Sequence, residues 1–306
     1  MDTDCTTTRH RPAAGGPAGV PASVAAIALF LYALWGGNPV AAKFALTRIP
    51  PIGLAGLRFT LGVLGLAAWC AWRREPLRPT RQELPPLLVN GLLFTVQIAT
   101  FHLGVFWSNA SHGAVLINAF PIFVALCAHF YLADDRLSAG KALGIAVGFA
   151  GIAAVFGDRW GREPTTMLRG DLALILSAVI LGFQIAYFKD AVARISPFKM
   201  MFAQMSICGL LLLAYGLAFE GLVHIRPTPA VLGAVAYMGI IVGAFSFTVW
   251  AVMMQRVAAS KLSVFAFSAP LWGVVLSHLL LGEPLTWLLL LGVGLVAAGI
   301  AIAVRS

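Results

Sequence analysis

The chain has 306 residues, of which 60% are hydrophobic and only 11% are charged. Soluble domains usually carry about 25% charged residues, so this chain has too little polar surface to cover a water-facing globule. The composition therefore excludes a soluble protein and predicts a protein embedded in lipid, where helices satisfy their own backbone groups. The formal net charge of +9 is explained below by membrane topology, so we infer no nucleic-acid partner from it.

Ten apolar stretches are long enough to cross a bilayer, which takes roughly 20 residues each. In chain order they cover residues 22–46, 52–72, 84–107, 110–132, 139–156, 171–189, 198–219, 229–254, 260–281 and 285–304. Residues 1–21 are polar, rich in proline and glycine, and predict a disordered tail. Because the first apolar run is itself long enough to span, we interpret it as a retained helix and not as a cleaved signal.

The two halves of the chain resemble one another. The segment SHGAVLINAFPIFVALCAHFYLADDRLS, residues 111–138, aligns with SKLSVFAFSAPLWGVVLSHLLLGEPLT, residues 260–286, and Pro121 then matches Pro270. Repeats of this kind are typical of transporters. The predicted fold is an all-α membrane protein of ten transmembrane helices, arranged as two repeats of five helices over 22–156 and 171–304. Since each repeat has an odd number of spans, the second enters the membrane inverted.

The lysines and arginines predict the orientation. With the amino terminus inside, fourteen of the 21 basic residues fall on the inner side, six fall on the outer side, and Arg58 lies within a span. Short cytoplasmic loops are enriched in positive charge. We therefore expect a multi-pass protein of the cell's inner membrane, with both termini and the 1–21 tail in the cytoplasm.

Prolines inside three predicted spans are candidate hinges or cavity walls. Pro39, Pro121 and Pro270 each remove a backbone donor and free a carbonyl one turn earlier. Interruptions at equivalent positions of two repeats point to the binding site. The alternative is that these prolines only bend helices for packing.

Arg58 is the most costly residue to place in lipid. It lies about six residues into the second span, and an arginine near a helix centre costs about 2.5–3.5 kcal/mol on insertion scales. A guanidinium that faces a cavity would hold a carboxylate or phosphate through two hydrogen bonds. Alternatively, it extends toward the interface or caps a neighbouring helix.

Other polar and aromatic residues within the spans complete the candidate solute-binding set. They are Asn38, Gln97, His102, Asn118, Gln184, Tyr187, Gln204, Trp250 and Trp272. Intramembrane polar side chains also join helices, for about 0.6 kcal/mol each. We expect part of this set to face the pathway and the remainder to hold helices together.

The twelve acidic residues fall in the tail, in loops or at span ends, so the sequence predicts none at mid-membrane. Proton-coupled carriers usually keep a titratable group there. Coupling would then have to use His102, His129 or His278, and a facilitator or a solute-driven exchanger fits at least as well.

Several motifs resemble a known family. LWGGNPVAAKFAL in the first span, PPIGLAGLRF at the start of the second, SNASHGAVLINAFPIFVAL and ASKLSVFAFSAPLWGVVLSHLLLGEPL are similar to the EamA branch of the drug/metabolite transporter superfamily, and the resemblance covers residues 22–304. It implies the ten-helix fold, solute transport, and an arginine at the position of Arg58 that lines the central pathway.

The sequence thus predicts a secondary transporter for a small polar or amphipathic metabolite, of the amino acid, nucleoside or aromatic metabolite class. We expect an exporter that uses a central cavity between the repeats, with the solute and the lipid bilayer as partners and a homodimer left open. The chain has no HExxH, GxSxG, DDxxD or phosphate-binding loop, so we expect no enzyme, cofactor or metal. The alternative is an intramembrane enzyme acting on a lipid or isoprenoid, which would need clustered carboxylates or histidines at one interface.

Overall fold

The computed structural model describes residues 22–131, 139–157, 165–192, 194–256, 265 and 268–305, and within them every regular element is a helix. The first half contains α1 (Ala22–Ala45), α2 (Pro51–Arg73), α3 (Leu84–Trp107), α4 (Ala110–Ile117), α5 (Phe120–Tyr131) and α6 (Ala139–Gly157). The second half contains α7 (Thr165–Ala191), α8 (Pro197–Phe219), η1 (Leu222–His224), α9 (Pro229–Ala236), η2 (Tyr237–Ser246), α10 (Phe247–Arg256), α12 (Ser268–Leu281) and α13 (Trp287–Arg305).

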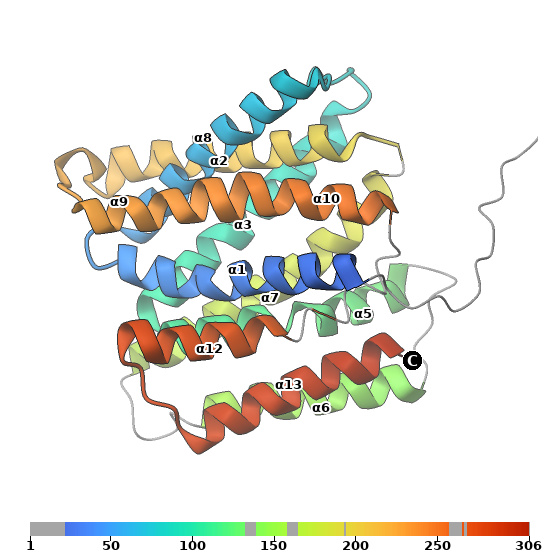
Figure 1. The fold of residues 1–306 in the computed structure, drawn as a ribbon, viewed down its shortest axis with the longest axis vertical. Helices are drawn as coiled ribbons and strands as arrows, with labels where there is room; N and C mark the ends of the chain where they lie inside the picture. Colours follow the sequence, from blue (N-terminus) through green and yellow to red (C-terminus); the bar gives the residue numbers. More distant parts are fainter. Residues whose placement is uncertain are drawn as a thin grey trace, which may run out of the picture.

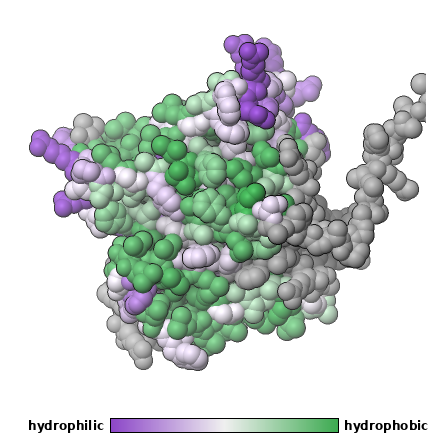
Figure 2. Space-filling view, viewed as in Figure 1, coloured by the Kyte–Doolittle hydropathy of each residue, from purple (hydrophilic) through white to green (hydrophobic). Residues whose placement is uncertain are grey.

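Six helices of the described chain are long and apolar enough to cross a membrane, and four shorter apolar helices accompany them. The six are Ser23–Ala45, Pro51–Arg73, Leu84–Trp107, Thr165–Phe188, Pro197–Phe219 and Pro229–Trp250. The face seen in Figure 2 is largely hydrophobic, and its most hydrophilic residues gather toward the edges. Large apolar side chains such as Leu210 and Trp287 are more than two-thirds exposed, as lipid contact requires. The chain is a multi-pass membrane protein.

Three predicted spans differ from the observed helices. The span predicted at 110–132 is divided into α4 and α5, because the helix stops at Ile117 and restarts at Phe120. The sixth predicted span, which corresponds to α7, begins at Thr165 and not at 171. Arg169 is exposed on this helix and does not break it. The ninth span is described as a helix only from Ser268, and most of residues 257–267 lie outside the described part of the chain.

The prolines of the two aligned segments begin helices. Pro121 is the second residue of α5 and Pro270 is the third residue of α12. Proline is well tolerated in the first turn, where its missing N–H has no intrahelical partner. The span around Pro121 is interrupted, as expected, at Asn118 and Ala119 between α4 and α5; Ala266, whose carbonyl Pro270 was expected to free, lies outside the described residues. Only Pro39 lies inside a continuous helix.

The helices run roughly along one direction in Figure 1, with α6 and α13 paired at one edge and α2 and α8 at the other. Glycines bring these pairs close together. A Cβ added to Gly299 of α13 would lie 2.5 Å from the backbone nitrogen of Gly148 in α6. On the other side, a Cβ on Gly56 of α2 would lie 2.5 Å from the Cα of Leu213 in α8. Small residues thus allow the backbone contacts that replace hydrophobic driving force in lipid.

The centre of the molecule is built from α1, α2, α3, α12 and the π-helical segment η2, which continues α9 and leads into α10. A Cβ on Gly239 of η2 would lie 2.6 Å from the carbonyl oxygen of Arg58, so η2 packs directly on α2 at this residue. π-Helical segments are rare and occur often at functional sites. Here the segment brings Tyr237 and Gly239 to the interior around Arg58.

Candidate functional site

Arg58 is buried in the middle of the molecule with unsatisfied hydrogen-bond donors. Its side chain is 3% exposed, and its Nε and Nη1 atoms have no hydrogen-bond partner. The guanidinium lies over the ring of Phe59, with the central carbon 4.6 Å from the ring centroid. It interacts electrostatically with Tyr237 and with Cys208 of α8. A buried donor left unpaired costs roughly 1–3 kcal/mol, so this position favours occupation by an acceptor.

Three further polar atoms on α1 and α3 are buried without a partner: Nε1 of Trp35, Oδ1 of Asn38 and Nε2 of His102. The Nδ1 atom of His102 lies 2.9 Å from the carbonyl oxygen of Ile98. That carbonyl only accepts, so Nδ1 must carry the hydrogen, and in the neutral ring Nε2 is an acceptor. Arg58 and His102 also interact electrostatically. The two helices α1 and α3 therefore present both donors and acceptors in the interior.

Tyr237 links this interior to α1. Its hydroxyl donates to the carbonyl oxygen of Leu34 over 2.6 Å, and a Cβ on Gly37 would lie 2.8 Å from the same hydroxyl oxygen. Pro39 deprives the neighbouring carbonyl of Trp35 of its usual donor. The Tyr237 side chain of η2 thus fixes the α1 segment around Asn38, in addition to the hydrogen bonds within α1 itself.

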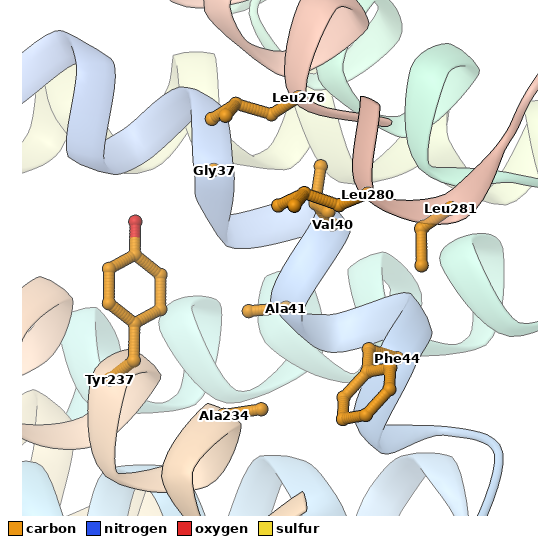
Figure 3. Close-up of a pocket in the computed structure, with 9 residues that line it drawn as sticks. All are labelled: Gly37, Val40, Ala41, Phe44, Ala234, Tyr237, Leu276, Leu280 and Leu281. Atoms are coloured by element: carbon orange, nitrogen blue, oxygen red, sulfur yellow. The ribbon is translucent and has the colours of Figure 1, made fainter. Parts of the chain in front are cut away.

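A pocket of about 490 Å³ lies between α1, the α9–η2 segment and α12 (Figure 3). Tyr237 is its polar member, and its hydroxyl points toward α1 in the close-up. The pocket is lined by Gly37, Val40, Ala41, Phe44, Ala234, Tyr237, Leu276, Leu280 and Leu281. Arg58 does not line it, but the two are connected through Tyr237, which lines the pocket and interacts electrostatically with Arg58. None of the predicted solute-binding residues lines this pocket, because its apolar walls carry no polar signal that a sequence search would select.

An aromatic cluster lies along α1 and α10. The ring of Trp35 contacts those of Tyr32, Phe247 and Trp250, with centroid distances of 5.1, 5.8 and 6.2 Å. Trp250 is therefore placed beside Trp35, as a candidate for an apolar wall. Trp272 of α12 is 45% exposed and packs its Cβ against Gly36 of α1.

Besides His102, four more of the predicted polar residues form hydrogen bonds within the protein: Gln97, Asn118, Gln184 and Gln204. Gln97 of α3 donates to the hydroxyl of Ser177 in α7 over 2.9 Å, and that hydroxyl donates back to the backbone carbonyl of Gln97. Asn118 donates to the carbonyl oxygen of Ala114 over 2.8 Å, where α4 ends.

The other two, Gln184 and Gln204, belong to one network. The Oε1 atom of Gln204 accepts from Asn90 over 2.7 Å and from Gln184 over 3.1 Å. This network joins α3, α7 and α8, while Oε1 of Gln184 and Oδ1 of Asn90 have no partner. Tyr187 is partly buried on α7.

The sequence reading missed a second buried polar group. Asp171 of α7 is fully buried, not merely at a span end, and it contacts His112 of α4 and Ser108. His112 was not among the histidines considered for coupling, whereas the side chain of His129 lies outside the described residues and His278 is exposed. A usable signal existed, because topology places the starts of the fourth and sixth spans on the same side of the membrane.

Comparison with known proteins gives the family. The EamA-like transporter family model matches residues 23–157 and 168–305. The uncharacterized transporter YoaV of Bacillus subtilis is 25% identical over 268 residues, covering 87% of this chain and 91% of that protein. A probable amino-acid metabolite efflux pump of Salmonella typhimurium is 23% identical over 290 residues, covering 91% and 93%.

A solved crystal structure also shares the fold, with a TM-score of 0.67, 20% sequence identity and coverage of 92% of this chain and 96% of the other. The two family matches together span nearly all of the described helices. The chain belongs to the EamA-like transporter family.

Proposed function

We propose that the protein is a secondary transporter that exports a small amphipathic metabolite with an anionic group, of the amino acid or aromatic metabolite class. The observation that carries the proposal is the buried guanidinium of Arg58, with two unpartnered donors, next to an apolar pocket of about 490 Å³. An apolar body would occupy the pocket, and a carboxylate would pair with the guanidinium through charge-assisted hydrogen bonds. The efflux pump to which this chain is similar supports the amino acid class and the outward direction.

The transport pathway would run between two inverted five-helix repeats, residues 22–156 and 171–304, in the inner membrane with both termini in the cytoplasm. In this orientation the pocket lies at the outer end of the molecule, because its lining includes Phe44 near the end of α1 and Leu281 at the end of α12. Arg58 is closed off from the pocket in this conformation. Transport would therefore require Tyr237 and its bond to Leu34 to move, so that solute passes between the pocket and the guanidinium.

The unpartnered atoms of Trp35, Asn38 and His102 support the same interior as the binding site, because they supply both donors and acceptors there. Within the described residues, the network of Asn90, Gln184 and Gln204 also presents unpartnered oxygens, and we assign it to the inner part of the pathway. Gln97 and Asn118 serve mainly to position α3, α7 and α4.

The test is transport by the purified full-length protein in liposomes. Liposomes loaded with an unlabelled mixture of amino acids should take up the radiolabelled mixture by exchange, and empty liposomes should not concentrate it. Separate arms with nucleosides and aromatic acids identify the class, and conversion of a labelled lipid or isoprenoid in place of exchange would support the enzyme alternative. Absence of exchange with every solute class would contradict the proposal.

A further inference from the structure

The buried pair of His112 and Asp171 has no role in the interior around Arg58. The Nδ1 atom of His112 lies 2.9 Å from Oδ2 of Asp171, and the side chains are 1% and 0% exposed. The other carboxylate oxygen, Oδ1, accepts from the hydroxyl of Ser108 over 2.5 Å. A carboxylate and an imidazole excluded from solvent in this way are costly unless their charges balance.

Charged groups face the pair from two neighbouring elements. From α1, the ammonium of Lys43 donates to the carbonyl oxygens of Val105 at 3.0 Å and Phe106 at 3.1 Å, and to that of Ser108. After α12, Glu283 accepts from the backbone nitrogens of Ala110 and Ser111, both over 2.8 Å, and so caps the start of α4.

Other ionisable groups on the neighbouring elements are exposed or contact other parts of the protein. His278 of α12 is exposed, and its Nδ1 atom lies 2.8 Å from the backbone carbonyl oxygen of Glu283. Arg169 on α7 is exposed. His102 of α3 bonds to its own helix and interacts with Arg58. The ionisable residues of α5, α6 and α13 lie toward the other ends of those helices in the sequence, as do Lys189 and Asp190 of α7.

Among Lys43, Asp171, Glu283 and His112, the charges balance when His112 carries a proton. Lys43 contributes one positive charge, and Asp171 and Glu283 contribute one negative charge each, which leaves one negative charge when His112 is neutral. A proton on His112 brings the cluster to zero. Histidine is the side chain whose ordinary titration falls between about pH 5 and pH 8.

We propose that His112 and Asp171 form the proton-binding site of this transporter. The imidazole takes up one proton and becomes an imidazolium, with its Nδ1–H donated to Oδ2 of Asp171, and it releases that proton when α4 separates from α7. This inference rests on the proposed transport function and adds its coupling ion. It also replaces the expectation that coupling would use His102, His129 or His278.

The pair is connected to the solute site through α4. A Cβ on Gly113, the residue after His112, would lie 3.4 Å from the Cβ of Pro39, next to Asn38. One residue further, Ala114 packs against Gly273 of α12. Because α4 is a separate eight-residue helix that ends at Ile117, a change in the His112 contact shifts a short rigid element that rests on the α1 segment. Proton and solute then bias the same movement, which is the condition for coupling.

Proton binding is tested without any solute. Nuclear magnetic resonance of the full-length protein in nanodiscs, with isotopically labelled histidine nitrogens, follows each ring across about pH 5 to pH 8. The signal that disappears in His112→Gln identifies His112. We expect it to change from the neutral to the charged form within this range, and Asp171→Asn to move the midpoint to lower pH. A His112 signal that keeps one protonation state throughout would overturn the proposal.

Coupling is tested in liposomes with the radiolabelled amino acid mixture. In the unaltered protein, a pH gradient should drive accumulation beyond the exchange level measured without a gradient. His112→Gln and Asp171→Asn should keep the exchange and lose the gradient-driven part. Glu220→Gln is the matched control, since Glu220 caps the start of α2 through Ile52 and Gly53 and does not contact the pair; it should keep both.

The outcomes separate the two proposals. Loss of exchange in the pair variants at normal membrane abundance would give the pair a positioning role and refute coupling, as would a gradient response that survives both substitutions. Absence of exchange in the unaltered protein would instead count against the amino acid class of the proposed function. The nuclear magnetic resonance titration would then decide the proton site by itself.

Discussion

The hydroxyl of Tyr237 in η2 donates to the carbonyl oxygen of Leu34 in α1, 203 residues earlier in the chain, over 2.6 Å. This bond joins the helix that carries Asn38 to the π-helical segment that packs on Arg58. It also joins two walls of the apolar pocket, because Tyr237 of η2 and Gly37 of α1 both line that pocket. A single hydroxyl thus connects the pocket wall with the charged interior.

Replacing Tyr237 by Phe should loosen this connection. The carbonyl of Leu34 loses a side-chain donor, so the variant should unfold about 1 kcal/mol more easily, and exchange should change because the pocket wall is no longer fixed to α1. Thermal unfolding in detergent and exchange in liposomes measure the two effects. Tyr215→Phe is the control, since Tyr215 is 48% exposed on α8 beside Phe219 and should leave both unchanged. Unaltered unfolding and exchange in Tyr237→Phe would show that the bond has no role.

Arg58→Gln should accumulate in the membrane at a normal level and transport poorly. Its Nε and Nη1 atoms have no protein partner, so truncation leaves no protein acceptor newly unpaired at those atoms. Arg58→Lys should restore transport only in part, because an ammonium cannot reproduce the two-pronged hydrogen bonding of a guanidinium. The exposed Arg78 supplies the control Arg78→Gln. Normal exchange by a well-expressed Arg58→Gln protein would remove this residue from the site.

Gly299→Ala should destabilise the contact between α13 and α6. The added methyl would lie 2.5 Å from the backbone nitrogen of Gly148. Because a backbone atom cannot move aside as a flexible side chain can, we expect the free energy of unfolding to fall by about 1–3 kcal/mol. Gly294→Ala on the same helix has nothing within 4 Å of the added Cβ. It should leave stability unchanged or raise it by about 0.5–1 kcal/mol. Equal effects of the two substitutions on thermal unfolding would contradict this account of the packing.

The start of α3 should make stability depend on acidic pH. The backbone nitrogen of Thr80 donates to the carboxylate of Glu83 over 2.7 Å, and Lys199 donates to the same group over 2.9 and 3.0 Å. These contacts, the Thr80 bond foremost, lower the pKa of Glu83. Since the pKa is lower in the folded state, the stabilisation is complete above the unfolded pKa and disappears as the pH falls through the folded pKa.

Glu83→Gln should therefore flatten the acidic limb of the curve of unfolding midpoint against pH. Glu75→Gln is the comparison, because Glu75 precedes α3 in the same connection. An acidic limb of unchanged slope in Glu83→Gln would assign the pH dependence to other carboxylates.

The proposed orientation predicts which cysteines an impermeant maleimide reaches in intact cells. Thr47 follows α1 and Arg78 follows α2, and both side chains are exposed. In a chain whose four native cysteines are replaced, Thr47→Cys should label from outside and Arg78→Cys only after permeabilisation. The reverse pattern would invert the topology and place the pocket on the cytoplasmic side.

The sequence predicted most of the helices because each span is a long apolar run between charged or proline-rich breaks. Pro51, Pro197 and Pro229 each begin a helix close to the predicted position. Pro121 indicated an interruption in the fourth span, but its exact position at Asn118 and Ala119 was not predicted, because the apolar run continues through these residues. Hydropathy reports burial in lipid and carries no information on where the backbone leaves the helical geometry.

Sequence alone also identified Arg58, since a charge inside an apolar run requires compensation wherever it lies. Only the tertiary structure decided which polar residues pair with each other. Gln97 hydrogen-bonds to Ser177, and His112 contacts Asp171, between helices that are far apart in the chain. The pocket was likewise invisible in the sequence, because apolar residues such as Leu276 and Val40 read the same whether they face lipid, a neighbouring helix or a cavity. Which of these they face depends on how the helices are rotated and spaced, and close glycine contacts between distant segments determine that packing.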